Sequence, residues 1–495
     1  MKEYLVIQSE KNFKIKYFIF LVFFFFFASY FPLFFIFNDL NFLPLGSNEA
    51  SHLIVAKSIL SGSPPYTEYF DARGPLFFYI LSLIFLLGNF LINFNFLYLL
   101  LTYFSAVIVF FICRNLYGII SAIFASISSI LILSQSFTAE NLIFLFLSLH
   151  IFFSFKMFSS KKYRYIILSA LFMSCAVLIR FNVSILALMS FLFFFVLEKD
   201  KIKFCFFYIL SGLIPLIILI VVYANYSNGL DIFYNATINY HLNLTHGRPF
   251  YMGLYQFLDV ISSSPYISLY CLSIVAFIFK DSLKKENLYL FASVIFGLFS
   301  ILLARKFNIH YLLTIAPFFI ILSSSIFSIT FLNSKKIIII FFIIILIPPS
   351  IENIYIKINN FYKPNNFDYA LSKTLENQID KKDKIFSSIN GVYLYLDKKN
   401  YLRIVDQSHF NRSYNYKSLY NKNFSFLDEF KFVFSQKPKF LIFDQNFKDQ
   451  SFFNNIKELI KDDYKVFDLN NHDEFIFRGN YRKYVNSIDI YILKN

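Results

Sequence analysis

The chain has 495 residues, of which 57% are hydrophobic, 22% are aromatic and only 16% are charged. Soluble domains carry about 25% charged residues, so this composition excludes a single soluble globule. The formal net charge is +15, but the basic residues form short clusters between apolar runs. There they indicate the orientation of a membrane protein and not a nucleic-acid surface.

Eleven apolar runs predict transmembrane helices, since about 20 apolar residues cover the hydrocarbon core of a bilayer. They lie near residues 17–38, 95–113, 116–134, 140–155, 164–180, 182–197, 203–224, 265–280, 287–304, 310–331 and 336–350. A cleaved signal peptide is the alternative for the first run, but that run continues without a small-residue cleavage site. The sequence therefore predicts a polytopic α-helical membrane protein.

Charge decides the role of one further apolar run, residues 75–90. With the N-terminus in the cytoplasm and eleven spans, nearly every basic cluster between spans falls on the cytoplasmic side, as the positive-inside rule requires. A twelfth span at 75–90 would move every later cluster outside. We therefore predict an interfacial or re-entrant helix at this position.

The domain organisation follows from a change in composition after the last span. Residues 1–350 form the predicted transmembrane module, with a first outer loop at 39–94. Residues 351–495 are richer in Asn, Lys and Asp and contain short apolar stretches such as Val392–Leu396 and Phe440–Phe443. They predict a small α/β domain on the non-cytoplasmic side of the plasma membrane. The four cysteines all lie in apolar segments and indicate no disulfide framework.

Charged residues gather in the first outer loop. Glu49 begins the stretch 49–60, whose apolar positions predict an amphipathic helix on the membrane. Asp71 and Arg73 follow a turn-forming segment at 61–65. The helix dipole alone explains an acid at a helix N-terminus, whereas the functional interpretation is a carboxylate that accepts a proton at headgroup level.

Further ionisable residues are expected on the outer face. Glu140 begins a span and Arg180 ends one, positions that the helix dipole and snorkelling to headgroups also explain. Arg305, Lys306 and His310 form a basic cluster against the trend of the other clusters. Guanidinium groups match phosphate oxygens, so these residues predict a site for a lipid-linked phosphate or pyrophosphate. Contact with lipid headgroups is the alternative.

Several short pieces of the chain match a known pattern in order and spacing. They are Asn48-Glu49, Ala56, Gly62 to Tyr66, Phe70 to Leu76, Arg114 to Gly118, Thr138 to Asn141, Ala176 to Phe181, Arg305, His310-Tyr311 and Pro317. This series resembles the C-type (GT-C) membrane glycosyltransferase superfamily. The group it resembles within that superfamily is the bacterial one similar to dolichyl-phosphate-mannose protein mannosyltransferases and the aminoarabinose lipid A transferase.

The resemblance implies transfer of a sugar from a polyprenyl-phosphate donor to a lipid, glycan or protein acceptor on the outer face of the plasma membrane, with inversion. A carboxylate would take the proton of the acceptor hydroxyl while cationic side chains hold the departing phosphate. By position in the motifs, Glu49 matches the second acid of the family pair and Glu140 a frequent acidic position. The basic positions are matched by Arg73, Arg180 and Arg305.

One departure from the family pattern concerns the proton acceptor. The first acid of the pair, which the family uses as catalytic base, is Asn48 here, and an amide cannot accept that proton. Either Glu49 or Asp71 then acts as the base, or the chain is a catalytically inactive relative. No cofactor is predicted; a divalent cation with oxygen ligands from Glu49 and Glu140 is the alternative that the resemblance implies.

Two other function classes remain as alternatives. A flippase or transporter for lipid-linked sugars would also place basic residues along the path of an anionic lipid. It would show ionisable residues near mid-membrane and related halves, whereas the charges here lie at span ends. A polysaccharide polymerase or ligase shares the donor but has a different arrangement of loops.

Overall fold

The computed structural model describes residues 47–88, 90–133, 139–197, 200–240, 254–255, 258, 267–279, 284–304, 309–328, 367–400, 426–449, 452–467 and 488–494. The chain divides into two compact units. Unit 1 comprises Met1–Leu40, Asn95–Pro215 and Pro249–Ile356, and unit 2 comprises Asn41–Phe94, Leu216–Arg248 and Lys357–Asn495. The predicted spans 17–38 and 336–350 lie outside the described residues.

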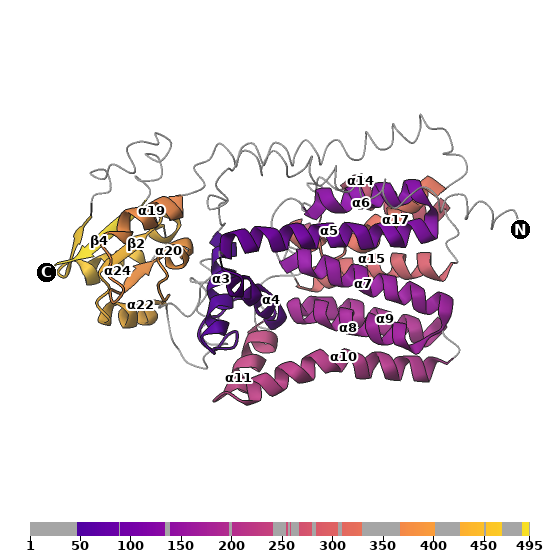
Figure 1. Ribbon diagram of the computed structural model, residues 1–495, viewed down its shortest axis with the longest axis horizontal. Helices are drawn as coiled ribbons and strands as arrows, with labels where there is room; N and C mark the ends of the chain where they lie inside the picture. Colours follow the sequence, from indigo (N-terminus) through magenta and orange to yellow (C-terminus); the bar gives the residue numbers. More distant parts are fainter. Residues whose placement is uncertain are drawn as a thin grey trace, which may run out of the picture. The chain divides into compact units, whose positions relative to one another are not determined.

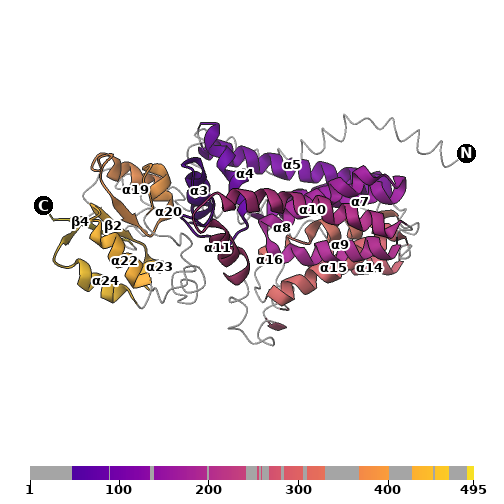
Figure 2. The same cartoon turned by 90° about the horizontal axis from the view of Figure 1, so that it is seen from below.

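Unit 1 is a bundle of apolar helices, several of which lie side by side and roughly parallel (Figures 1 and 2). Its helices are α5 (Phe90–Tyr117), α6 (Ile119–Leu133), α7 (Ala139–Ser160), α8 (Tyr163–Ile179), α9 (Ser184–Leu197), α10 (Lys201–Ala224), α14 (Ile267–Phe279), α15 (Lys285–Ala304), α16 (Ile309–Leu312) and α17 (Ala316–Ser324), with short 3-10 turns η2 (Phe181–Val183) and η4 (Ser325–Ser328). The division between units falls within α5 and α10.

Length and composition single out membrane spans among these helices. Within the described part of the chain, four helices are long and apolar enough to cross a bilayer: Ile92–Tyr117, Ala139–Ser160, Lys201–Ala224 and Lys285–Leu302. Five shorter apolar helices accompany them, including Pro75–Leu86. The prediction of a polytopic helical membrane protein is thus confirmed, while the count of eleven spans stays a prediction. At 12 residues, α4 (Pro75–Leu86) is too short to cross alone.

The predicted span 310–331 differs from the structure because it is interrupted. Helix α16 ends at Leu312, a turn follows at 313–315, and α17 starts at Ala316. Pro317 lies in the first turn of α17. Proline disfavours helical geometry in the residues before it and is well accommodated at a helix start, which explains the break.

A buried polar cluster joins four helices of unit 1 around His150 of α7. The imidazole Nε2 lies 2.5 Å from the hydroxyl of Tyr289 on α15 and 3.2 Å from that of Ser190 on α9. The Nδ1 atom lies 2.8 Å from the hydroxyl of Ser169 on α8. Because each of these contacts lies inside an apolar bundle, the cluster fixes the mutual register of the helices.

The first part of unit 2 contains α3 (Ser47–Leu60), α4, α11 (Gly229–Tyr234) and the π-helical turn η3 (Asn235–Asn239). Helix α3 packs against α4. The sequence predicted an amphipathic surface helix at 49–60, but every residue from Ala50 to Ala56 is buried. Small and β-branched residues on all sides allow α3 to be enclosed by neighbouring segments, so it is a core helix of this unit.

The second part of unit 2 is built on a small mixed sheet with the strand order β1-β2-β4-β3. Its strands are β1 (Ile385–Ser387), β2 (Phe440–Phe443), β3 (Tyr464–Val466) and β4 (Asp489–Leu493). Strands β1 and β2 are parallel, whereas β4 is antiparallel to β2 and β3. The surrounding helices are α19 (Phe367–Glu376), α20 (Asn390–Tyr395), α22 (Phe426–Ser435), α23 (Gln445–Lys448) and α24 (Phe453–Ile460) (Figure 2).

The core of this α/β part is aromatic. Phe386 of β1 and Phe443 of β2 lie 5.5 Å apart between ring centroids, and Phe430 and Phe453 pack against them from α22 and α24. Of the two apolar stretches noted in the sequence, Phe440–Phe443 is strand β2, whereas Val392–Tyr395 belongs to helix α20. The predicted combination of strands and helices is confirmed as a small mixed sheet.

Candidate functional site

An acidic group that consists of Glu49, His52 and Asp71 lies in unit 2, where α3 meets the segment before α4. Glu49 and His52 are three residues apart on α3, which places them on one helix face. The His52 Nδ1 atom lies 2.8 Å from Oδ2 of Asp71, and both side chains are buried. The predicted residue Asp71 is therefore one half of an acid–imidazole pair, in which the carboxylate fixes the orientation of the ring.

The backbone around Arg73 holds Asp71 in place. The Arg73 N–H donates a hydrogen bond to Asp71 Oδ1 at 3.1 Å, and the Tyr66 hydroxyl donates to the Arg73 carbonyl at 2.5 Å. Tyr66 itself has a φ of 72°, which bulky residues rarely adopt. Such strained residues persist where the surrounding structure fixes them and are frequent at functional sites.

Burial changes the acidity of Glu49. Loss of hydration raises the pKa of the Glu49 carboxyl above its ordinary value of 4.5, although a backbone hydrogen bond and the charges of His52 and Arg73 oppose this rise. A carboxylate with a raised pKa is a stronger proton acceptor at neutral pH.

Aromatic rings enclose the imidazole of His52. Phe77 and Phe78 of α4 approach it edge-on, with centroid distances of 5.1 and 6.3 Å. These rings keep water from much of the ring surface. The aromatic edges and the carboxylate hold the imidazole in a single orientation. A fixed orientation favours proton transfer at this position.

A second group of predicted residues comes together in unit 1. Arg180, the C-cap residue of α8, forms an ion pair with Glu140 in the first turn of α7. The guanidinium carbon lies 3.9 Å from the ring centroid of Tyr311 in α16. All three side chains are buried. The guanidinium thus has a fixed plane, with a carboxylate at one edge and an aromatic face beneath it.

Two predicted site residues, Arg305 and His310, have no described side chain. Arg305 lies outside the described residues, and His310 belongs to α16 without a described side chain. Sequence reasoning missed His52 and Tyr311 as site residues. The spacing of His52 from Glu49 was the available signal, whereas nothing in the sequence pairs His52 with Asp71, 19 positions further on.

One of the two carboxylates expected as ligands of a divalent cation, that of Glu140, is engaged by another residue. Asp71 is engaged by His52, and Glu140 is engaged by Arg180, so each carboxylate already has a positive or proton-donating partner in place of a metal. No group of three or more His, Cys, Asp or Glu residues suited to a metal occurs among the described residues.

Comparison with protein families gives the chain its class. Residues 72–224 match the family described as dolichyl-phosphate-mannose-protein mannosyltransferase. The chain carries a domain of this membrane glycosyltransferase family. The match confirms the family resemblance and the enzyme class predicted from the sequence. No curated protein matches the sequence of the chain.

Two solved structures support the fold. ArnT from Cupriavidus metallidurans bound to undecaprenyl phosphate is similar with a TM-score of 0.62 and 10% identity, over 94% of this chain and 97% of that chain. ArnT from the same organism in the apo state gives a TM-score of 0.59 and 10% identity, over 94% of this chain and 96% of that chain. At this identity the likeness establishes the architecture of the glycosyltransferase, a polytopic helical membrane protein with a small C-terminal sheet.

Proposed function

We propose that the protein transfers a sugar from a polyprenyl-phosphate donor to a hydroxyl of a lipid, glycan or protein acceptor on the outer face of the plasma membrane. The match of residues 72–224 to the mannosyltransferase family supports the reaction class. The ligand bound in the similar ArnT structure, undecaprenyl phosphate, supports the donor class. We further propose residues 1–350 as the catalytic module and 351–495 as a non-cytoplasmic domain.

The observation that carries this proposal is the buried pair of His52 and Asp71, together with Glu49 on the same face of α3 as His52. Asp71 already accepts hydrogen bonds from His52 and from the Arg73 backbone. Glu49 has a pKa raised by burial, which suits it to accept a proton. Of the two bases expected from the sequence we therefore favour Glu49, because Asp71 is already engaged by His52.

In the proposed reaction the acceptor oxygen attacks the anomeric carbon on the face opposite the phosphate. The bond from that carbon to the phosphate oxygen breaks, and the polyprenyl phosphate leaves with the bonding electron pair. The acceptor proton passes to the Glu49 carboxylate. Attack opposite the leaving group inverts the anomeric configuration, so one carboxylate and no covalent sugar–enzyme intermediate are required.

We further propose that the leaving phosphate is held by the guanidinium groups of Arg73, Arg180 and Arg305, which remain charged, and by His310 as a further hydrogen-bond donor. Arg180 illustrates how this works. Its guanidinium has five N–H donors, and Glu140 takes up one edge while Tyr311 supports the plane. Donors on the other edges suit phosphate oxygens, and the charge that develops on the leaving group is then met by a preoriented cation.

The test is transfer of a labelled sugar from a panel of polyprenyl-phosphate sugars in membranes that contain the intact chain. Glu49→Gln is expected to reduce the transfer rate at least a hundredfold, because general base catalysis contributes about 10²–10⁴-fold. Glu458→Gln, on the exposed surface of α24, is the matched control and should transfer at the unaltered rate. Equal rates in the intact and Glu49→Gln chains would exclude Glu49 as the base.

The same assay addresses the alternatives. Movement of the lipid-linked sugar across the bilayer without any transfer would identify a flippase. Neither movement nor transfer, in membranes with native acceptors, would identify an inactive relative in which Asn48 marks the lost base. A C-terminal reporter active only in the cytoplasm would overturn the proposed location of residues 351–495.

A further inference from the structure

We propose that residues 390–400, which comprise α20 and the segment after it, are a positioning clamp for the acidic group on α3. This inference rests on the proposed function, because the clamp acts on the group that contains Glu49, His52 and Asp71. It assigns a role in catalysis to the C-terminal α/β part of the chain. The clamp touches both segments that supply the acidic group, α3 and the connection to α4.

The first contact joins Asn390 to Ser51. The Asn390 Nδ2 donates a hydrogen bond of 2.7 Å to the Ser51 hydroxyl, and both side chains are buried. Helix α20 packs against α3 at this point. Ser51 lies between Glu49 and His52 in the sequence of α3. A change in the position of Ser51 therefore changes the rotation of the helix that carries both functional side chains.

The second contact fixes the other segment. The Tyr69 hydroxyl donates to the backbone carbonyl of Asn400 at 2.9 Å, with both residues buried. Tyr69 is two positions before Asp71. The Asn400 Nδ2 also lies 3.5 Å from Oδ1 of Asn390, so the two contacts belong to one connected set. Together they determine the separation between α3 and the Asp71 segment.

Ion pairs border these buried contacts. Lys57 of α3 pairs with Asp397, and Glu68 pairs with Lys399. Asp397 and Lys399 are exposed, and exposed pairs add little stability, typically about 0–1 kcal/mol. Their arrangement is nevertheless specific, because Asp397 and Lys399 carry opposite charges and each pairs with an opposite charge on a different segment. They select one register of the clamp against α3 and the Glu68 segment.

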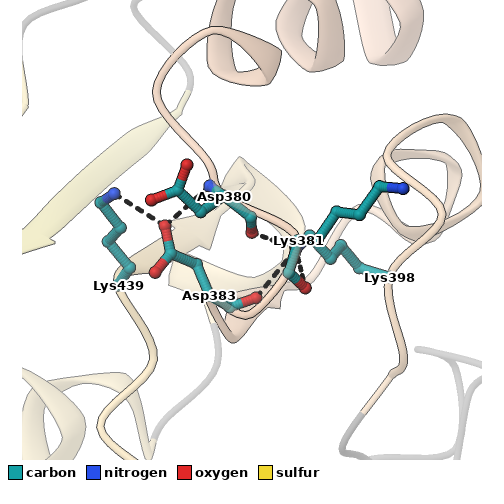
Figure 3. A network of polar contacts seen from close by, with 5 residues as sticks. All are labelled: Asp380, Lys381, Asp383, Lys398 and Lys439. Carbon is teal, nitrogen blue, oxygen red and sulfur yellow. Dashed lines mark hydrogen bonds and ion pairs between the residues drawn. The ribbon is translucent and has the colours of Figure 1, made fainter.

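The clamp is anchored to its own domain by Lys398, which points away from these partners. The Lys398 Nζ donates to three backbone carbonyls, those of Asp380 at 2.6 Å and of Lys381 and Asp383 at 3.0 Å (Figure 3). Lys439 pairs with the Asp383 carboxylate at 2.7 Å, which completes the network. Residues 397–400 thus lie between a rigid turn of the domain and the segments around the acidic group.

Loss of the clamp contacts should lower kcat without changing the donor KM. Neutral buried hydrogen bonds contribute about 1 kcal/mol to stability, so their loss leaves the chain folded. The orientation of a proton acceptor affects the rate far more than it affects binding of the donor phosphate. Asn390→Ala and Ser51→Ala should each lower kcat by about five- to tenfold and leave KM for the donor unchanged. Ser51→Thr, which keeps a hydroxyl, should restore most of the rate.

The experiment combines this kinetic analysis with hydrogen exchange of the full chain in lipid nanodiscs. Asn390→Ala should increase amide exchange in residues 47–60, and the double variant with Ser51→Ala should have no further effect, because both changes remove the same contact. The Lys398 Nζ binds carbonyls of residues 380–383 and not α3 or the acidic group. Lys398→Met should nevertheless lower kcat, because it releases the clamp from its anchor. Asn454→Ala, an exposed asparagine of α24, is the matched control and should change nothing.

The two readouts separate failure of the clamp from failure of the proposed function. Unchanged exchange in α3 would overturn the clamp whatever the activity. Increased exchange with an unaltered kcat would also overturn it, because the contact would then be structural only. If the intact chain transfers no sugar from any donor, the proposed function fails, and with it the catalytic role of the clamp, while the exchange data still decide whether residues 390–400 hold α3.

Discussion

The guanidinium of Arg180 lies over the ring of Tyr311, with 3.9 Å between its central carbon and the ring centroid, while Glu140 pairs with its edge. Residues from three helices of unit 1 therefore define the position of one cation. A planar, delocalised cation fits this arrangement and an ammonium does not. The planar shape of the Arg180 guanidinium thus matters at this position as well as its charge.

Arg180→Lys tests the importance of this plane. The variant keeps the positive charge but loses the flat contact with Tyr311 and the forked donors. We expect KM for the polyprenyl-phosphate sugar to rise about tenfold, corresponding to about 1.4 kcal/mol, in a steady-state transfer assay. Arg164→Lys, at an exposed position, is the control. Equal donor KM in both variants would show that Arg180 does not contact the donor.

Tyr66→Phe probes the support beneath Arg73. The change removes the hydroxyl that donates to the Arg73 carbonyl and retains the ring among its aromatic neighbours Phe70, Phe78 and Tyr223. We expect a fall in transfer rate of about fivefold, as for loss of one hydrogen bond, with little change in thermal stability. Tyr226→Phe removes a similar bond to the Gly62 carbonyl at the exposed side of the same loop and should leave the rate unaltered.

Much of unit 1 could be predicted from the sequence, because hydrophobic length alone identifies apolar helices. Glu140 and Arg180 were correctly placed at the ends of their helices. Their pairing was beyond sequence reasoning, since 40 positions separate them and only the packing of α7 against α8 brings them together. The interruption near Pro317 could have been expected from the proline, but the apolar run through 310–331 obscured it.

Only part of the candidate site in unit 2 could be predicted from the sequence. Glu49, Asp71 and Arg73 were selected because charges stand out in an apolar chain. His52 was missed although it lies three positions after Glu49, because nothing in the sequence pairs it with Asp71, 19 positions further on. The burial of α3 was also missed, since its neighbours include α20, whose residues lie more than 300 positions away. Long-range partners of this kind leave no local trace in a sequence.

Asp368→Asn tests whether the Asp368 carboxyl makes the stability of the α/β part of the chain depend on pH. Burial raises the pKa of Asp368 from 3.8 to about 7, with a further rise from the charge of Asp444. A raised folded-state pKa means that the neutral form stabilises the fold. The contribution of Asp368 to the free energy of unfolding is therefore largest below pH ~4. It declines as the pH rises from about 4 to about 7 and is constant above that.

The measurement is thermal unfolding of the intact chain and of the variant between pH 4 and 8, followed by hydrogen exchange in residues 367–400. Asp368→Asn should remove the decline and be the more stable chain at pH 8. Asp462→Asn, at an exposed position, serves as the control and should keep the decline. Parallel pH dependence in the intact chain and in Asp368→Asn would contradict the prediction.

Gly391→Ala addresses the contact between α19 and α20. Replacing a helical glycine by alanine usually stabilises a helix by about 0.5–1 kcal/mol. At Gly391 the new Cβ would lie only 2.2 Å from Oδ2 and 2.8 Å from Cβ of Asp368, so we expect a lower unfolding temperature. In Gly212→Ala, within α10, the nearest atom to the new Cβ is the Ala170 carbonyl oxygen at 4.0 Å. That variant should be unchanged or more stable.

The hydrogen bond between Ser51 and Asn390 spans 339 positions of the chain, which has a consequence for biogenesis. Ribosomes add roughly 5–20 residues per second, so α3 emerges on the order of tens of seconds before its partner. During that interval the nascent chain has its acidic residues but lacks the segment that orders them. Chains whose synthesis stops before residue 390 would lack this contact, and we expect them to transfer sugar more slowly than the complete chain. The full transfer rate is thus reached only after the C-terminal part of the protein has been made.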